Sequence, residues 1–457
     1  MPTLRASLAI VLLSSLTALA APPADLTQKI DAAATKALAE PGAAAVSVAV
    51  ARNGEIIFAK AYGLADVELD VPATPDSLFR IGSVTKQFSA AAIMRLVEQG
   101  KVSLDAEIQT YLPDFPKKDH PVTIREILTH TSGIWSYTSD GKWMSRDASL
   151  ELTPTELIAT FAEKPLDFEP GTKWHYSNSA YYLLGPIIEK VSGKPYAAFL
   201  QDEFFTPLGL KHTRYESNSD IIKNRAQGYS LQQGKLTNDR AIGADVPGAA
   251  GSLLSTASDL CRWEMALASG KVVSPESYKQ MTTPAVLTGG KQTDYGFGLQ
   301  IDEWEDRRRI SHGGGIFGFN SMLLTLPADD KHADDLTVAV LVNNDSINSG
   351  KFADIVAKNA LGIEVFEPKD LDLTEAEIAR FKGDFAFEGI PLEIKLFDRD
   401  GKMWAQATGQ KETRLLYQGN GEFRPTFDTD VKFVFDEGSS DSFVLHQGGQ
   451  IPAKRKK

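Results

Sequence analysis

The stretch Leu78-Phe79-Arg80-Ile81-Gly82-Ser83-Val84-Thr85-Lys86 joins a strand-like run to an apolar helix, which the pattern predicts from about Ser83 to Glu98. Positions three apart share one face of a helix, so the Ser83 hydroxyl and the Lys86 amine can meet. A serine hydroxyl is a weak nucleophile until a neighbour takes its proton. The first turn of a helix also favours developing negative charge. The stretch therefore indicates nucleophilic catalysis by Ser83.

The Ser-x-x-Lys pattern occurs twice in this chain, at 83–86 and at 139–142. Ordinary composition gives roughly one or two such matches by chance in a chain of this length. The second match, Ser139-Asp140-Gly141-Lys142, lies in a polar, glycine-containing stretch that is predicted to be a loop. Taken alone, Ser83 would also fit the N-cap of a helix, so the assignment depends on other segments.

Two further segments carry the residue types that acyl transfer needs. Tyr176-Ser177-Asn178 follows a turn at 169–171, and in an extended loop its outer residues point the same way. A tyrosine can exchange protons there, and an asparagine can hydrogen-bond an amide. The run 312–315, His-Gly-Gly-Gly, leaves the backbone open to a substrate, and its N–H groups could stabilise an oxyanion.

In this order and spacing, the three segments resemble the β-lactamase and penicillin-binding-protein superfamily, especially its class C β-lactamase-like branch. The resemblance covers roughly residues 24–361. It implies an acyl-enzyme mechanism in which Ser83 is the nucleophile and Lys86 its proton partner. Tyr176 would act as general base or as proton relay to the leaving group. An ordinary lysine titrates near 10.4 and a tyrosine near 10, so which of the two is the base stays open.

The resemblance also implies the groups that hold the substrate. Asn178 would bind the substrate or orient Lys86, and the backbone N–H groups of Ser83 and Gly315 would form the oxyanion hole. His312, Gly313 and Gly314 would line the substrate site. Many family members have Lys where this chain has His312, and Thr or Ser where it has Gly313.

This departure bears on the substrate, because a lysine and a hydroxyl at those positions would help to hold a carboxylate. A histidine is only partly charged near neutral pH, and glycine offers no hydroxyl. The sequence thus favours esters, small peptides and D-amino-acid amides. β-Lactamase or D-Ala-D-Ala carboxypeptidase activity is the alternative, and a non-catalytic penicillin-recognising binding or sensor protein is a second one.

The distribution of patterns predicts an α+β fold. Strand patterns occur near both ends of the first part, and helices fill its middle, which indicates an antiparallel sheet flanked by helices with an inserted helical lobe. The predicted strands and helices are as follows: helices 24–40 and 348–361, and strands 44–52, 55–62, 295–301, 320–326 and 337–342. Asn53-Gly54 between two strands is a strong hairpin signal.

Four regions are predicted along the chain. Residues 1–20 have the pattern of a signal peptide, and 21–361 would form the hydrolase domain. Residues 362–372 would be a linker, and 373–457 a small antiparallel β barrel that resembles a lipocalin-like accessory domain. Its predicted strands are 391–397, 402–407, 413–417, 422–427, 431–435 and 442–446, and the basic run 454–457 is predicted to be a solvated tail.

Composition excludes several classes of function. The formal net charge of −12 disfavours nucleic acid and anionic membrane surfaces as partners. Cys261 is the only cysteine and is predicted to be buried, which excludes a zinc site of several thiolates. The seven histidines are scattered, and His130 and His175 are predicted to be structural. We expect no metal, no cofactor and no membrane span, a small-molecule or peptide substrate, and an exported protein, periplasmic or secreted; the sequence leaves the oligomeric state open.

Overall fold

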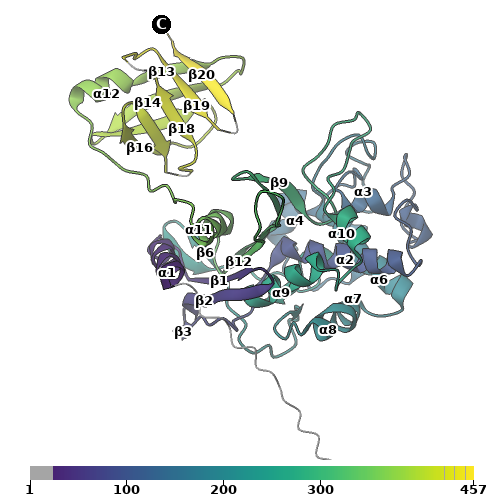
Figure 1. Ribbon diagram of the computed structural model, residues 1–457. Helices are drawn as coiled ribbons and strands as arrows, with labels where there is room; N and C mark the ends of the chain where they lie inside the picture. Colours follow the sequence, from purple (N-terminus) through teal and green to yellow (C-terminus); the bar gives the residue numbers. More distant parts are fainter. Residues whose placement is uncertain (1–23, 427, 437, 448, 457) are drawn as a thin grey trace, which may run out of the picture. The chain divides into compact units, whose positions relative to one another are not determined.

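The computed structural model describes residues 24–426, 428–436, 438–447 and 449–456, so the predicted signal peptide lies outside the described residues. The chain divides into two compact units, Met1–Ile363 and Glu364–Lys457, and the division falls inside the predicted linker (Figure 1).

The first unit is built on a seven-stranded antiparallel sheet in the order β3-β2-β1-β12-β11-β10-β9. Its strands come from both ends of the unit, as predicted: β1 (Ala45–Arg52), β2 (Glu55–Asp66), β3 (Val71–Pro72), β9 (Gln300–Trp304), β10 (Arg307–Ile316), β11 (Phe319–Leu326) and β12 (Leu336–Val342). The predicted hairpin is confirmed, because Asn53 and Gly54 both take the positive φ angles that a two-residue turn requires.

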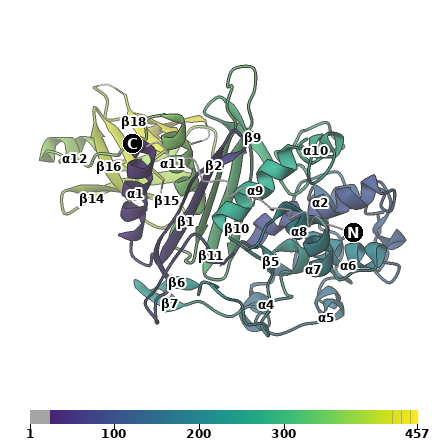
Figure 2. The same cartoon turned by 60° about the horizontal axis from the view of Figure 1, so that its bottom comes forward.

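Helices cover both faces of this sheet (Figure 2). Helices α1 (Ala24–Leu38) and α11 (Ser349–Leu361) pack on one face, against Val46, Val48 and Val50 of β1. The alternate residues of β1 point to the other face, where α9 (Ala257–Ala268) packs against the sheet. Side chains alternate along a strand, so this one buried strand joins the two halves of the core.

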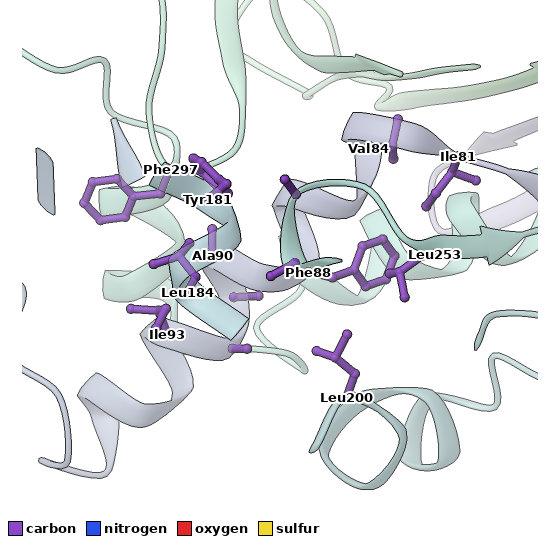
Figure 3. Packing of buried hydrophobic residues seen from close by; sticks show 14 of the residues in the cluster. Ile81, Val84, Phe88, Ala90, Ile93, Tyr181, Leu184, Leu200, Leu253 and Phe297 are labelled. Atoms are coloured by element: carbon purple, nitrogen blue, oxygen red, sulfur yellow. The ribbon is translucent and has the colours of Figure 1, made fainter. Parts of the chain in front are cut away.

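The helical lobe surrounds α2 (Thr85–Glu98), whose residues are buried on nearly every side. Phe88 stacks on Trp263 at 3.9 Å, and Figure 3 shows Phe88 and Ile93 among the packed apolar side chains. The other helices of the unit are α3 (Ile124–Leu128), α4 (Gly141–Arg146), α5 (Pro154–Ala159), α6 (Asn178–Ser192), α7 (Tyr196–Leu200), α8 (Thr206–Leu208) and α10 (Pro275–Met281). Two small sheets complete the unit: β4 (Phe79–Arg80) with β8 (Leu253–Ser255) and β5 (Arg214–Tyr215), and β6 (Tyr229–Gln232) with β7 (Lys235–Asn238).

Two predicted boundaries differ from those of the structure. The helix expected from Ser83 opens with a 3-10 turn at Gly82–Val84, and the α-helix begins at Thr85. The strand expected over 295–301 begins only at Gln300, because the chain turns at Gly298, where φ is +69°. The run 312–315 lies within β10.

The second unit is a closed barrel of eight antiparallel strands, which confirms the predicted barrel. The strands are β13 (Gly383–Phe387), β14 (Glu393–Arg399), β15 (Lys402–Ala407), β16 (Thr413–Gly419), β17 (Glu422–Pro425), β18 (Lys432–Phe435), β19 (Ser442–His446) and β20 (Gln450–Arg455). Helix α12 (Glu375–Phe381) places Phe381 in the barrel core.

The basic tail was predicted wrongly, since Lys454 and Arg455 belong to strand β20. Strand β20 closes the barrel by pairing with β13 and β19. The Arg455 side chain donates a 2.8 Å hydrogen bond to the carbonyl of Ser440 and lies over the ring of Phe385. Among the described helices, none has the length and apolar character needed to cross a bilayer.

Candidate active site

Ser83 lies where the helical lobe meets the edge of strand β10. The contact depends on Gly82, which has a φ of +49° and faces Gly315 closely. A Cβ at position 82 would lie 3.1 Å from the Gly315 nitrogen. Glycine therefore lets the backbone before Ser83 approach Gly315, which brings together two residues more than two hundred positions apart.

Lys86 is completely buried one turn further along, and its amine has three polar neighbours. Its Nζ lies 3.0 Å from Oγ of Ser83, and it donates 2.8 Å hydrogen bonds to Oδ1 of Asn178 and to the carbonyl of Ala250. Burial lowers the pKa of Lys86 well below its usual range. Two acceptors take two N–H groups, so a neutral amine turns its lone pair toward the Ser83 hydroxyl.

Tyr176 lies beside this pair and is half-buried. Its ring centroid is 4.8 Å from the Lys86 amine. Burial raises the pKa of Tyr176, while a hydrogen bond with the Ser83 side chain acts in the opposite direction. The net shift keeps Tyr176 a protonated phenol across the neutral range, in a position to give a proton.

His130 supports the segment that carries Tyr176. The backbone N–H of Ser177 donates to Nδ1 of His130 at 3.1 Å, and the His130 ring lies 4.2 Å from the ring of Tyr176. His130 is fully buried and has a φ of +58°. These contacts agree with the structural role predicted for His130. The backbone N–H of His175 donates to the His130 carbonyl, while its own side chain is exposed.

Asn178 opens helix α6, and both ends of its amide have protein partners. Its Oδ1 accepts from Lys86, and its Nδ2 donates to Oγ1 of Thr138 at 3.0 Å. Its backbone N–H donates to Oγ of Ser136 at 3.1 Å. Of the two roles that the sequence left open, this geometry favours the orientation of Lys86.

His312 is buried, and its environment differs from what the sequence suggested. Its Nδ1 donates to the carbonyl of Gly313 at 2.6 Å, so Nε2 accepts the hydroxyl proton of Tyr295 at 2.8 Å. Burial and the nearby Lys86 lower the pKa of His312 to about 3. The side chain is therefore neutral at physiological pH, not partly charged as predicted, because burial, which no local pattern indicated, disfavours its charged form.

The three glycines of β10 have different surroundings. Gly313 and Gly315 border cavities, whereas Gly314 packs inward. A Cβ at Gly314 would lie 2.0 Å from the carbonyl oxygen of Ile81 and 2.3 Å from Oγ of Ser321. Gly314 thus serves close packing of β10 on the segment before Ser83, and the structure does not place it in either cavity.

Ser83 stands at the junction of two cavities. The first, of about 560 Å³, is also bordered by Asn178, Ala250 and Gly315, and its other lining residues include Tyr137, Thr138, Met144, Asp239, Arg240, Ile242, Val246, Phe317 and Asp345. The second, of about 570 Å³, is lined by Ser83, Trp174, Tyr176, Asp294, Tyr295, Gln300, His312 and Gly313. A substrate bound at Ser83 can extend to both sides.

The second Ser-x-x-Lys match has no such surroundings. Ser139 is exposed at the end of a short 3-10 turn, Tyr137–Ser139, and Lys142 lies in α4. Within the described part of the chain, the two side chains share no hydrogen bond. Nor do the described residues contain a group of three His, Cys, Asp or Glu side chains that could hold a metal ion. Cys261 is buried, as predicted.

Sequence reasoning missed three parts of this site: the Ala250 carbonyl on Lys86, the Tyr295 hydroxyl on His312, and Asp294 in the second cavity. Two of them had a signal in the sequence. The segments Tyr295-Gly296-Phe297-Gly298 and Gly251-Ser252-Leu253-Leu254-Ser255-Thr256 resemble segments of the β-lactamase superfamily; Tyr295 begins the first, and Ala250 directly precedes the second. No pattern in the sequence distinguishes Asp294 from other exposed carboxylates.

The sheet with its helical lobe, and the Ser-Lys-Tyr group at their junction, define the β-lactamase- and transpeptidase-like class of proteins. Residues 30–361 match the sequence model of the β-lactamase family, and the chain belongs to this family.

Similar proteins extend the likeness to most of the chain. Penicillin-binding protein 4* of Bacillus subtilis (strain 168) is 26% identical, over 88% of this chain and 93% of its own. The esterase EstB of Burkholderia gladioli is 36% identical over a shorter match, 44% of this chain and 54% of its own. The structure of the octameric penicillin-binding protein homologue from Pyrococcus abyssi has a TM-score of 0.69 and 25% identity, covering 94% of this chain and 100% of that one.

Proposed function

We propose that this protein is a serine hydrolase that forms a covalent acyl-enzyme on Ser83 and cleaves esters and small or D-amino-acid amides and peptides. The observation that carries the proposal is the buried Lys86 amine, 3.0 Å from the Ser83 hydroxyl, with two of its N–H groups already engaged. Family membership supports the same chemistry.

In the proposed reaction, neutral Lys86 takes the proton of Ser83 as Oγ attacks the carbonyl carbon of the substrate. The backbone N–H groups of Ser83 and Gly315 would hold the oxyanion. The directions of the two pKa shifts support one division of roles: Lys86, whose pKa is lowered, would be the base, and Tyr176, whose pKa is raised, would give the proton to the leaving group. Water then attacks the carbonyl carbon of the acyl-enzyme, and the two proton transfers run in reverse. Tyr176 takes a proton from the water, and Lys86 returns its proton to Oγ of Ser83 as the product leaves.

The substrate class follows from the charge of the site. His312 is neutral, and Gly313 offers no hydroxyl, so the strand that borders Ser83 presents no cation to a substrate carboxylate. β-Lactams and peptides with a free C-terminus carry such a carboxylate, whereas simple esters and amides do not. The similarity to an enzyme named as an esterase supports esters as the first choice.

A turnover panel tests this proposal on the purified mature protein. We expect p-nitrophenyl esters to have the highest kcat/KM, followed by D-alanyl p-nitroanilide, with nitrocefin and a D-Ala-D-Ala peptide well below both. Nitrocefin as by far the best substrate would show a β-lactamase instead. Tight binding of penicillins without turnover of any compound would show a binding or sensor protein.

We also propose that the chain is exported, on the evidence of its N-terminal sequence. Arg5 precedes an apolar stretch of about a dozen residues, and Ala18-Leu19-Ala20 has the small-x-small pattern of a cleavage site. Expression in a bacterial host should therefore give a mature protein outside the cytoplasm whose first residue is Ala21. Edman sequencing of the periplasmic and secreted fractions checks this; an intact N-terminus confined to the cytoplasmic fraction would contradict it.

A further inference from the structure

The two cavities at Ser83 differ in the catalytic group that each contains. Asn178 and Gly315, which would orient Lys86 and hold the oxyanion, border the first cavity. Tyr176 borders the second cavity and is absent from the lining of the first. Ser83 alone of these four borders both.

This difference orients the substrate. When the tetrahedral intermediate collapses, the bond to the leaving group breaks, and the departing oxygen or nitrogen needs a proton. The donor assigned to that step is Tyr176, so the leaving group lies on the side of the second cavity. The acyl part, which stays on Ser83, then extends into the first.

The charge of the second cavity comes from one described carboxylate. Of the described residues that line it, Asp294 alone carries a formal charge at neutral pH, because His312 is neutral. The Asp294 side chain is exposed, and no basic side chain within the described residues lies at ion-pair distance from it. Its backbone is fixed, since its carbonyl accepts from the N–H of Ile301 at 2.9 Å.

An aromatic wall borders the same cavity. Trp174 is 41% exposed, a high value for so large an apolar side chain beside a catalytic group. Its ring is held edge-on to His130, at 6.2 Å and 86°, and lies 5.9 Å from the ring of Tyr295. An exposed indole ring and an unpaired carboxylate both attract an organic cation in water.

We propose that the second cavity is a leaving-group subsite that selects by charge, in which Asp294 and Trp174 receive an alcohol or amine carrying a cationic group. Asp294 at the same time repels a leaving group that ends in a carboxylate. The inference rests on the proposed function and names the substrate class for the same site. For an ester, the acyl–oxygen bond breaks, the departing oxygen takes the proton of Tyr176, and the acyl group remains on Ser83.

Three esters of one acyl group test the subsite: the choline ester, its neutral isostere the 3,3-dimethylbutyl ester, and the ester of 3-hydroxypropanoate. We expect kcat/KM to fall in that order, with the choline ester about fivefold above its isostere, as suits an exposed charge pair of ~1 kcal/mol. Asp294→Asn should lower that ratio markedly, and Asp294→Asn combined with Trp174→Leu should bring it close to one. Asp306→Asn is the matched control, because Asp306 is exposed in the turn before β10, outside the cavity, with a φ of +58° that asparagine tolerates.

Ionic strength gives a second measurement that needs no variant. The choline preference of the unmodified enzyme should shrink as salt rises, because salt screens an exposed charge pair. Equal rates for choline ester and isostere, or a preference that Asp294→Asn leaves undiminished, would overturn the charge selection while leaving the hydrolase intact. Hydrolysis of p-nitrophenyl esters but of none of these three esters would also overturn the charge selection alone. Hydrolysis of no compound in this series or in the turnover panel would overturn the proposed function itself and this inference with it.

Discussion

Replacing Ser83 by alanine is expected to lower kcat/KM for the best ester by a factor on the order of 10⁴ to 10⁶. The variant removes the oxygen that forms the acyl bond, and among the described hydroxyls only that of Ser83 is hydrogen-bonded to the Lys86 amine. Labelling of the purified protein by a fluorophosphonate, read by mass spectrometry of the modified peptide, should disappear in the same variant.

The chain itself offers a matched control for this experiment. Ser139→Ala changes the serine of the other Ser-x-x-Lys match, which is exposed and outside the cavities. We expect full labelling and unchanged turnover in Ser139→Ala. Labelling that persists in Ser83→Ala but is lost in Ser139→Ala would place the nucleophile at the other motif and refute the site described above.

Replacing Lys86 by methionine is expected to slow acylation by a factor on the order of 10³ to 10⁴, since it removes the base but keeps the volume of the buried side chain. Single-turnover labelling of Ser83 measures the acylation step directly. Lys142→Met is the corresponding control and should have no effect. Asn178→Ala should give a smaller loss of acylation, because it removes one of the two acceptors that orient the amine.

The pH dependence follows from the lowered pKa of Lys86. Catalysis needs the neutral amine, so kcat/KM should rise with pH through the pKa of Lys86 and be lost as the pH falls below it. In the unfolded chain the same amine titrates near 10.4 and therefore holds a proton that the folded state has released. Between the two pKa values the unfolded state binds more protons, so the free energy of unfolding rises with pH in that window.

Lys86→Met should remove this contribution to the pH slope of stability, which denaturant unfolding at a series of pH values would measure. An unchanged slope, or an acylation rate in Lys86→Met close to that of the unmodified protein, would leave Tyr176 as the candidate for the general base. In that case the bound substrate would have to lower the pKa of Tyr176, which burial raises in the free protein.

The parts of this protein that sequence could predict are those encoded within a few residues. The Ser83–Lys86 pair depends on a spacing of three along one turn, and the hairpin at Asn53-Gly54 depends on two residues that accept positive φ. Alternation of apolar residues likewise predicted most of the sheet. Side chains along a strand alternate between its two faces every two residues, and this repeat does not depend on which strand pairs with it. Even spacing of short strands predicted the barrel of the second unit.

Only the tertiary structure decided what depends on residues far apart in the chain. Burial lowers the pKa of Lys86, and Asn178 and the carbonyl of Ala250 hold its amine in place. Burial also lowers the pKa of His312, and Tyr295 meets its Nε2. Solvent exclusion and the approach of a distant dipole set a pKa, and neither is written into local sequence. The sequence by itself indicated the family and pointed to Ser83 as the nucleophile. Only folding decided that Lys86 and His312 are buried with lowered pKa values, and that Asp294 borders the second cavity at Ser83.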